Sequence, residues 1–313
     1  MDLLNMSHDH LLLNHVPTIG TVIGIGLLLL SLVRRNDHLK HASLEVFFVV
    51  ALLTLPAFLT GMAAETEIIH RDGVNPAAIV AHHDAALQAF ALMQLTGAVA
   101  WVALWLFRRR SKAPAWVIGA TLLLSILTLA MMTPAATLGG EIRHPEIRIT
   151  EDAPPAATGW LTRAAIQLLV QDNRAVWPVA ETLHFLGLCL IFGVLSIVNL
   201  RLLGVMKAIP FHAVHRLLPW GMLGFGVNLT TGMLFFIAAP MQYTTNTPFY
   251  WKVVFLMAAG LNLLYVTVSA QAWALEAGQD TPIFDKAVGA SAIVLWIGVI
   301  YWGRMLPFLG NAF

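Results

Sequence analysis

The sequence predicts an all-α polytopic membrane protein, in which eight transmembrane helices form two tandem four-helix bundles. The 313 residues are 58% hydrophobic and only 11% charged, and the mean hydropathy of +0.75 is far above that of soluble domains. Apolar runs of about 20 residues recur along the chain, each long enough to cross roughly 30 Å of hydrocarbon. Several short motifs also recur in the same order in both halves, which indicates the tandem arrangement.

Each apolar run is bounded by polar or charged residues and is taken as one helix. The expected helices are 13–34, 42–63, 84–107, 115–137, 178–202, 214–239, 249–273 and 285–303. The N-terminal segment lacks the basic region and the small-residue cleavage site of a signal peptide, so we interpret the first run as a retained anchor.

The charges of the links predict how the helices are oriented. Basic residues follow the first, third and fifth runs, whereas acidic residues follow the second. Lys and Arg are enriched in cytoplasmic loops, so both termini are expected on the periplasmic side of a bacterial inner membrane. The net charge of +1 and the lack of a basic stripe give no indication of a nucleic-acid partner. The expected environment is the lipid bilayer.

Three motifs occur once in each half and define the domains. They are His-x-x-His at 38–41 and 212–215, Thr-Gly-Met at 60–62 and 231–233, and Leu-Met at 92–93 and 256–257. The expected domains are a first bundle over 1–137, a periplasmic linker over 138–176 and a second bundle over 177–313. Within the linker, residues 158–171 are expected to form a short amphipathic helix on the membrane surface.

The halves resemble two uncharacterised families of bacterial four-helix membrane proteins. In the first half the resemblance rests on His10-x-x-x-x-His15-Val16-Pro17, with Val16 where the motif usually has Phe, and on Gly139-Gly140-Glu141-x-x-His144. In the second half it rests on Trp177-Pro178-x-x-Glu181-x-x-His184, Leu200-Arg201-Leu202-Leu203-Gly204, Thr231-Gly232-Met233 and Phe249-Tyr250-Trp251-Lys252 followed by Asn262. The resemblance implies four-helix membrane bundles that bind haem, as in b-type cytochromes.

Several classes of enzyme are excluded by what the sequence lacks. The single cysteine, Cys189, supports neither a disulfide framework nor a zinc or iron–sulfur site. There is no Walker loop, dinucleotide fingerprint, Gly-x-Ser-x-Gly elbow or His-Glu-x-x-His sequence. A metal or haem in this protein would therefore depend on His, Met or carboxylate ligands.

Histidines at predicted helix ends are the strongest candidates for ligands. His15 opens the first helix and His82-His83 opens the third, and these helices lie diagonally across a four-helix bundle. Two imidazoles at matched depth are what a b-type haem requires as axial ligands. Neighbouring residues on a helix point about 100° apart, so one of the pair faces the core. We favour His15 and His83 as the haem-iron ligands. Gly20, Gly24 and Gly26 by themselves favour close packing of helices, and they support haem only in combination with these histidines.

Three interpretations of His184 stay open. In the first, His184 ligates a second haem, with His10 or Met233 as the other ligand. In the second, His184 hydrogen-bonds a quinone beside Glu181 and Lys252, which would be the catalytic groups for proton transfer. Alternatively, it is a buried histidine whose hydrogen bonds are satisfied within the protein.

The remaining histidines offer two further alternatives. His38, His41, His212 and His215 lie in basic links, where they favour contacts with solvent or lipid headgroups, although the repeated spacing keeps a second haem layer open. Glu141 and His144, with outer residues such as Glu65, form an alternative metal site. That site requires the fourth helix to continue through Gly139-Gly140, and we expect these glycines to end it.

Together these patterns predict a membrane electron-transfer subunit. It would hold haem b and exchange electrons between a quinone pool and a periplasmic redox protein or other subunits of a membrane complex, as in a quinone-linked oxidoreductase. The alternatives are a transporter for a metal ion or small solute, and a cofactor-free membrane anchor of a respiratory complex.

Overall fold

A computed structural model describes residues 5–71, 74–143 and 159–309. These residues form helices and connecting turns, with no strand among them. Eight helical stretches are long and apolar enough to cross a membrane, which confirms the predicted class of multi-pass all-α protein. The helices are α1 Met6–Leu13, α2 His15–Arg34, α3 Asp37–Ile68, α4 Pro76–Arg110, α5 Ala115–Arg143, α6 Arg163–Asp172, α7 Val176–Leu202, α8 Phe211–Val214, α9 Leu218–Ala238, α10 Met241–Thr244, α11 Thr247–Val268, α12 Ala270–Trp273 and α13 Ile283–Leu309.

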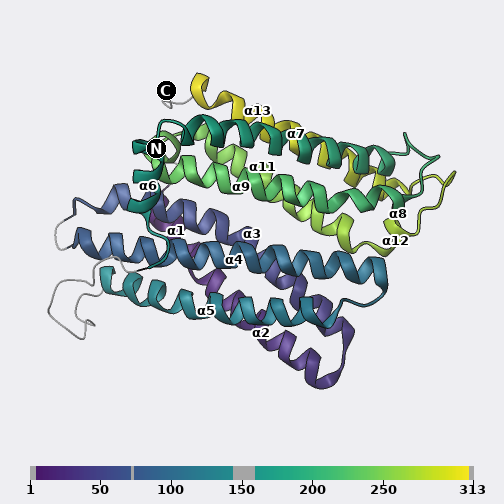
Figure 1. Ribbon diagram of the computed structural model, residues 1–313, viewed down its shortest axis with the longest axis horizontal. Coiled ribbons are helices and arrows are strands. Elements are labelled where there is room, and N and C mark those ends of the chain that lie inside the picture. Colours follow the sequence, from purple (N-terminus) through teal and green to yellow (C-terminus); the bar gives the residue numbers. More distant parts are fainter. Residues whose placement is uncertain (1–4, 72–73, 144–158, 310–313) are drawn as a thin grey trace. The chain divides into compact units, whose positions relative to one another are not determined.

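The chain divides into two compact units. Unit 1 comprises residues 1–104 and 113–167, and unit 2 comprises residues 105–112 and 168–313. The long helices of each unit lie side by side and alternate in direction along the chain (Figure 1). The last turns of α4 therefore belong to unit 2, and the start of α6 belongs to unit 1.

Several helices extend beyond their apolar runs. The third helix begins at Pro76, so His82 and His83 lie in its second turn, and α3 continues past the acidic residue Glu65. The expectation that Gly139-Gly140 ends the fourth helix is wrong, because α5 stays helical to Arg143. A helical glycine costs about 1 kcal/mol relative to alanine, and close packing at Gly139 offsets that cost.

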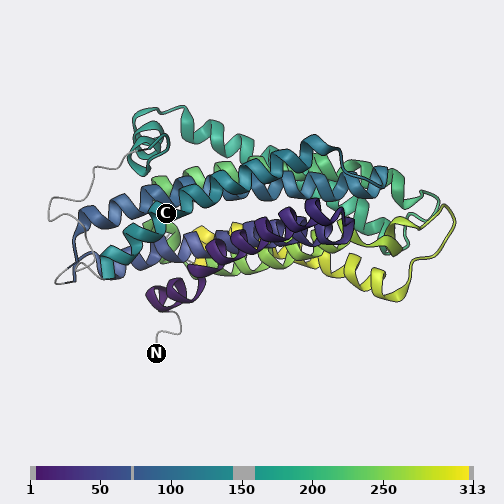
Figure 2. The same ribbon diagram turned by 90° about the horizontal axis from the view of Figure 1, so that it is seen from below.

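The first span is bent rather than straight. Helix α1 ends at Leu13, and α2 begins after the turn residue Asn14 (Figure 2). Pro17 accounts for the break, because its ring lacks an N–H and would clash with the carbonyl of Leu13 four residues earlier. The bend lets α1 pack along α3, which brings His10 against that helix.

Small residues bring the helices of unit 1 into close contact. A Cβ atom at Gly20 would lie 2.4 Å from Val50, and one at Gly24 would lie 2.6 Å from the Phe47 ring. At Gly26, by contrast, a Cβ would meet nothing within 4 Å. Gly20 and Gly24 therefore serve the helix-on-helix packing that is common in membranes.

In unit 2 the Leu-Arg-Leu-Leu-Gly motif ends α7. Gly204 has a φ of +84°, and Val205 N–H donates to Leu200 O while Gly204 N–H donates to Arg201 O. These two bonds are the Schellman arrangement, which favours glycine at this position. The fully buried Arg201 donates to the carbonyls of Ile209 and Glu276 and to Thr281. The motif is thus explained by chain folding.

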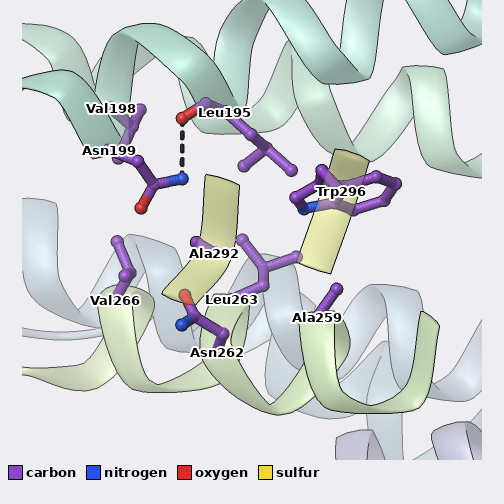
Figure 3. A pocket seen from close by; sticks show the side chains of 9 residues that line it. All are labelled: Leu195, Val198, Asn199, Ala259, Asn262, Leu263, Val266, Ala292 and Trp296. Carbon is purple, nitrogen blue, oxygen red and sulfur yellow. Dashed lines mark hydrogen bonds between the residues drawn. The ribbon is translucent and has the colours of Figure 1, made fainter. Parts of the chain in front are cut away.

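The cavity in unit 2 is too small for a cofactor. It measures about 10 Å³ and lies between Asn199, Asn262 and Trp296 (Figure 3). The Oδ1 atom of Asn199 is buried without a hydrogen-bond partner in the described part of the chain. One water molecule would fill this volume and could satisfy that oxygen, so the cavity is not the candidate site.

Candidate functional site

His10 is held in a fixed orientation against α3. Its Nδ1 lies 3.0 Å from the carbonyl oxygen of Ala57. A carbonyl only accepts hydrogen bonds, so Nδ1 carries a proton, and in the neutral imidazole the lone pair is on Nε2. The ring lies over Gly61, where a Cβ would be 2.9 Å from His10 Cε1. Glycine is therefore what leaves room for the imidazole.

His82 is held in the same way against α5. Its Nδ1 lies 2.8 Å from the carbonyl oxygen of Ala135, which again leaves the lone pair on Nε2. The ring lies over Gly139, where a Cβ would be 2.9 Å from His82 Cε1. In both cases the accepting carbonyl lies four residues before the glycine, so each ring sits over one helical turn.

These two surfaces share a sequence, Pro-Ala-x-x-x-Gly, at Pro56–Gly61 and Pro134–Gly139. We call each of them a histidine seat. The His10 and His82 rings are close enough to interact electrostatically. Among the described residues, neither Nε2 has a hydrogen-bond partner. Unit 1 therefore offers two oriented imidazoles whose coordinating nitrogens are available.

His83 lies beside this pair but is bound differently. Its Nδ1 donates to Glu65 Oε2 at 3.1 Å, and Arg163 Nη1 contacts both Glu65 oxygens at 2.7 and 2.8 Å. The Arg163 backbone N–H donates to Asp84 Oδ1 at 2.7 Å. The His83 ring packs edge-on against the Phe58 ring, with 5.6 Å between the ring centroids. The His83 Nε2 atom is buried without a hydrogen-bond partner among the described residues.

We call Glu65, His83, Asp84 and Arg163 the acidic clamp. It fixes the start of α6 over the ends of α3 and α4, because Arg163 binds a residue from each of them. Close contact continues at Gly159, where a Cβ would overlap the Gln88 amide of α4. The clamp thus lies at the end of α3, which carries one histidine seat, and at the end of α4, which carries His82.

The other residues predicted for this site are placed as follows. His15 is exposed at the start of α2, so the structure brings His10 and His82, rather than His15 and His83, onto equivalent seats. Glu141 lies near the end of α5, and His144 lies outside the described residues. Within the described ranges no group of three or more His, Cys, Asp or Glu side chains is arranged to hold a metal ion.

Unit 2 has a related arrangement around His184. Its Nδ1 lies 2.8 Å from Thr231 Oγ1, and Thr231 donates its own proton to Val227 O. The hydroxyl therefore accepts from Nδ1, and Nε2 keeps the lone pair. The His184 ring lies beside Gly232, with a Cβ-to-Cε1 distance of 3.6 Å, and packs against Phe235 at 5.9 Å between ring centroids.

The groups predicted to act with His184 lie on different helices. Lys252, in the second turn of α11, extends over Gly303 of α13, where a Cβ would be 3.5 Å from Nζ. Glu181 is exposed on α7 and lies near Tyr243. Burial, with a smaller contribution from the Glu181 charge, raises the pKa of Tyr243 to about 12. Tyr243 is therefore a neutral hydrogen-bonding group at physiological pH.

The histidines of the basic links differ from one another. His38 and His212 are exposed, as expected for contacts with solvent or headgroups. His215 is fully buried and packs against Trp105, Phe211 and Trp273. For His215 the expected exposure is wrong, because aromatic rings enclose it.

Comparison of the chain with family models, curated proteins and solved structures finds no match. The histidine seats are therefore the main indication of function in this chain.

Proposed function

We propose that the protein is a b-type haem subunit for membrane electron transfer, in which His10 and His82 would hold the haem of unit 1. The observation that carries the proposal is the pair of equivalent histidine seats. Each seat fixes one imidazole through Nδ1 and leaves the Nε2 lone pair free, which is the orientation that metal-ligating histidines use.

The donor set of unit 1 fits haem better than a bare metal ion. A b-type haem would be held by one or two protein nitrogen donors, whereas a structural or catalytic metal ion is usually held by three or more side chains. The imidazoles of His10 and His82 would meet the haem requirement. The absence of a Cys-x-x-Cys-His sequence means that such a haem would be held without covalent attachment.

When bound, haem supplies reversible one-electron transfer. The residues of the chain then have two tasks. The seats set the distance and orientation of each imidazole, because both the carbonyl bond and the glycine contact restrict the ring. The acidic clamp holds the start of α6 against the ends of α3 and α4, beside His82 and His83.

The expected redox partners are a quinone pool within the membrane and a protein on the periplasmic side. Both expectations depend on the predicted topology, in which the ends of α3, α5 and α7 that carry the site residues face the periplasm. A site near that surface would allow electron exchange with a docked protein.

Purified protein expressed with a haem supply tests the proposal. The expected result is a reduced-minus-oxidised spectrum of a low-spin b-type haem, extractable with acidic acetone. His10→Ala and His82→Ala should each remove the unit 1 haem, while the exposed His15→Ala serves as the matched control and should retain it. A colourless wild-type preparation would contradict the proposal and favour the cofactor-free anchor. Haem lost in His15→Ala and kept in His10→Ala would return the ligand role to His15.

A further inference from the structure

Unit 2 repeats the pairing of a nitrogen donor with a helical glycine, although its glycines do not follow the Pro-Ala sequence of the seats. His10 of α1 lies over Gly61 of α3, and His184 of α7 lies beside Gly232 of α9. Both glycines belong to the repeated Thr-Gly-Met motif. Each histidine therefore comes from the first span of its unit and packs on the second span at the same motif.

The other half of the arrangement is also repeated. His82 of α4 lies over Gly139 of α5, and Lys252 of α11 lies over Gly303 of α13. In each unit this donor is in the second turn of the third span, and the glycine is in the last two turns of the fourth. Unit 2 thus places an imidazole and an amine where unit 1 places two imidazoles.

Both unit 2 donors have free coordinating atoms. His184 Nε2 has no hydrogen bond within the described ranges, and Lys252 Nζ has no hydrogen bond or ion pair there. The two groups are close enough to interact electrostatically. The amine nitrogen of a lysine, like the imidazole nitrogen of a histidine, is a donor that can bind a metal.

We propose that unit 2 holds a second b-type haem whose axial donors are His184 Nε2 and Lys252 Nζ. This inference rests on the proposed haem function and adds a second site to it. The aromatic side chains beside His184 suit a flat macrocycle: Phe235 packs on the imidazole, and Trp177 packs on Phe235 at 4.8 Å between centroids. The presence of Lys252 within this span is then explained by its role as an iron ligand.

The experiment uses the full chain and a His82→Ala background, in which the unit 1 haem is removed. One haem per chain should remain, with a six-coordinate low-spin spectrum. Adding His184→Ala should remove it. Adding Lys252→Ala should convert it to a five-coordinate high-spin form, and free imidazole or ethylamine should restore the low-spin spectrum.

Two further substitutions separate ligation from charge. Lys252→His should keep the haem low-spin, because it recreates the donor set of unit 1. Lys252→Arg should give the high-spin form, because a guanidinium keeps its proton and does not ligate iron. Lys286→Ala removes a lysine of the same unit that pairs with Asp280, and as the matched control it should leave the spectrum unchanged.

The outcomes distinguish this inference from the proposed function. One haem in wild type that is lost in His82→Ala and unaffected by His184→Ala would overturn the second site and leave the first in place. A second haem that stays low-spin in both Lys252→Ala and Lys252→Arg would overturn the lysine ligand. No haem at all would overturn both.

Discussion

Gly139→Ala tests whether the histidine seats position ligands. The added Cβ would lie 2.9 Å from His82 Cε1, whereas ordinary carbon contacts begin at about 3.5 Å. The imidazole must therefore recede by roughly 0.6 Å. Metal–ligand distances vary by only about 0.2 Å, so a ring displaced this far cannot keep its bond to a haem iron without further rearrangement. The mutant should lose the unit 1 haem or convert it to the high-spin form.

Gly119→Ala is the matched control, because Gly119 lies on the same helix and its Cβ would meet nothing within 4 Å. Both substitutions gain up to about 1 kcal/mol of helix propensity, and Gly139→Ala loses about 1–3 kcal/mol to overpacking. The net change in stability is small, so the discriminating measurement is the reduced-minus-oxidised spectrum with haem content per chain. Identical spectra for the two variants would refute the positioning role of the seat.

Three other predictions concern the clamp, a surface ion pair and the topology. The side chains of Glu65 and Arg163 are only 11% and 21% exposed, so Arg163→Met should lower the free energy of unfolding by about 2–3 kcal/mol; the exposed Arg174→Met is the control, and equal denaturation midpoints for the two would contradict the clamp. Hydrogen bonds from Lys286 and then Lys207 lower the pKa of Asp280 to about 2, below its unfolded value of about 4, so the stabilisation by this carboxylate is present above pH 4 and is lost as the pH falls through 2. Thermal scans should accordingly show a deficit in Asp280→Asn at pH 7 that disappears near pH 2, and a deficit that is the same at both would count against the ion pairs. For the topology, cysteine at Arg174 should label with an impermeant thiol reagent in intact cells and cysteine at Lys112 should not; the reverse pattern would place the site ends in the cytoplasm.

The sequence predicts the number of spans well and their ends poorly. Apolar length is a strong signal, because each span must cross the same thickness of hydrocarbon. The helix ends carry no such signal. The low hydropathy of residues such as Glu65 and His82 predicts that they lie in loops or at helix caps, yet they lie inside α3 and α4. Their polar side chains are accommodated in the helices by the acidic clamp and the seat on α5.

The positions of the site residues depend on helix bends and local contacts, which cannot be inferred from composition or from the expected depth of a residue in the membrane. Matched depth favoured His15, whereas the structure seats His10, because Pro17 breaks the first span and turns α1 onto α3. Similarly, His83 was favoured over His82, but Glu65 binds His83 while Gly139 accommodates His82. One sequence pattern could have indicated the two histidine seats. Pro-Ala-x-x-x-Gly occurs in both helices that receive a histidine, and a repeat of proline and glycine inside apolar spans indicates close approach of another group.

The contacts of the histidines with glycines, rather than the spacing of the histidines in the sequence, show which residues of the two units correspond. The equal spacing from His15 to Gly24 and from His184 to Gly193 pairs His15 with His184, but the glycine contacts pair His184 with His10, which lies five residues earlier. The bend at Asn14 absorbs this offset, because α7 has no break at the corresponding point and delivers its histidine from a continuous helix. The same register assigns Lys252 to the position of His82. His184 therefore has no histidine opposite it in its own unit because that position is held by a lysine, and the units differ both in this donor and in the Pro-Ala sequence that precedes the glycines of unit 1.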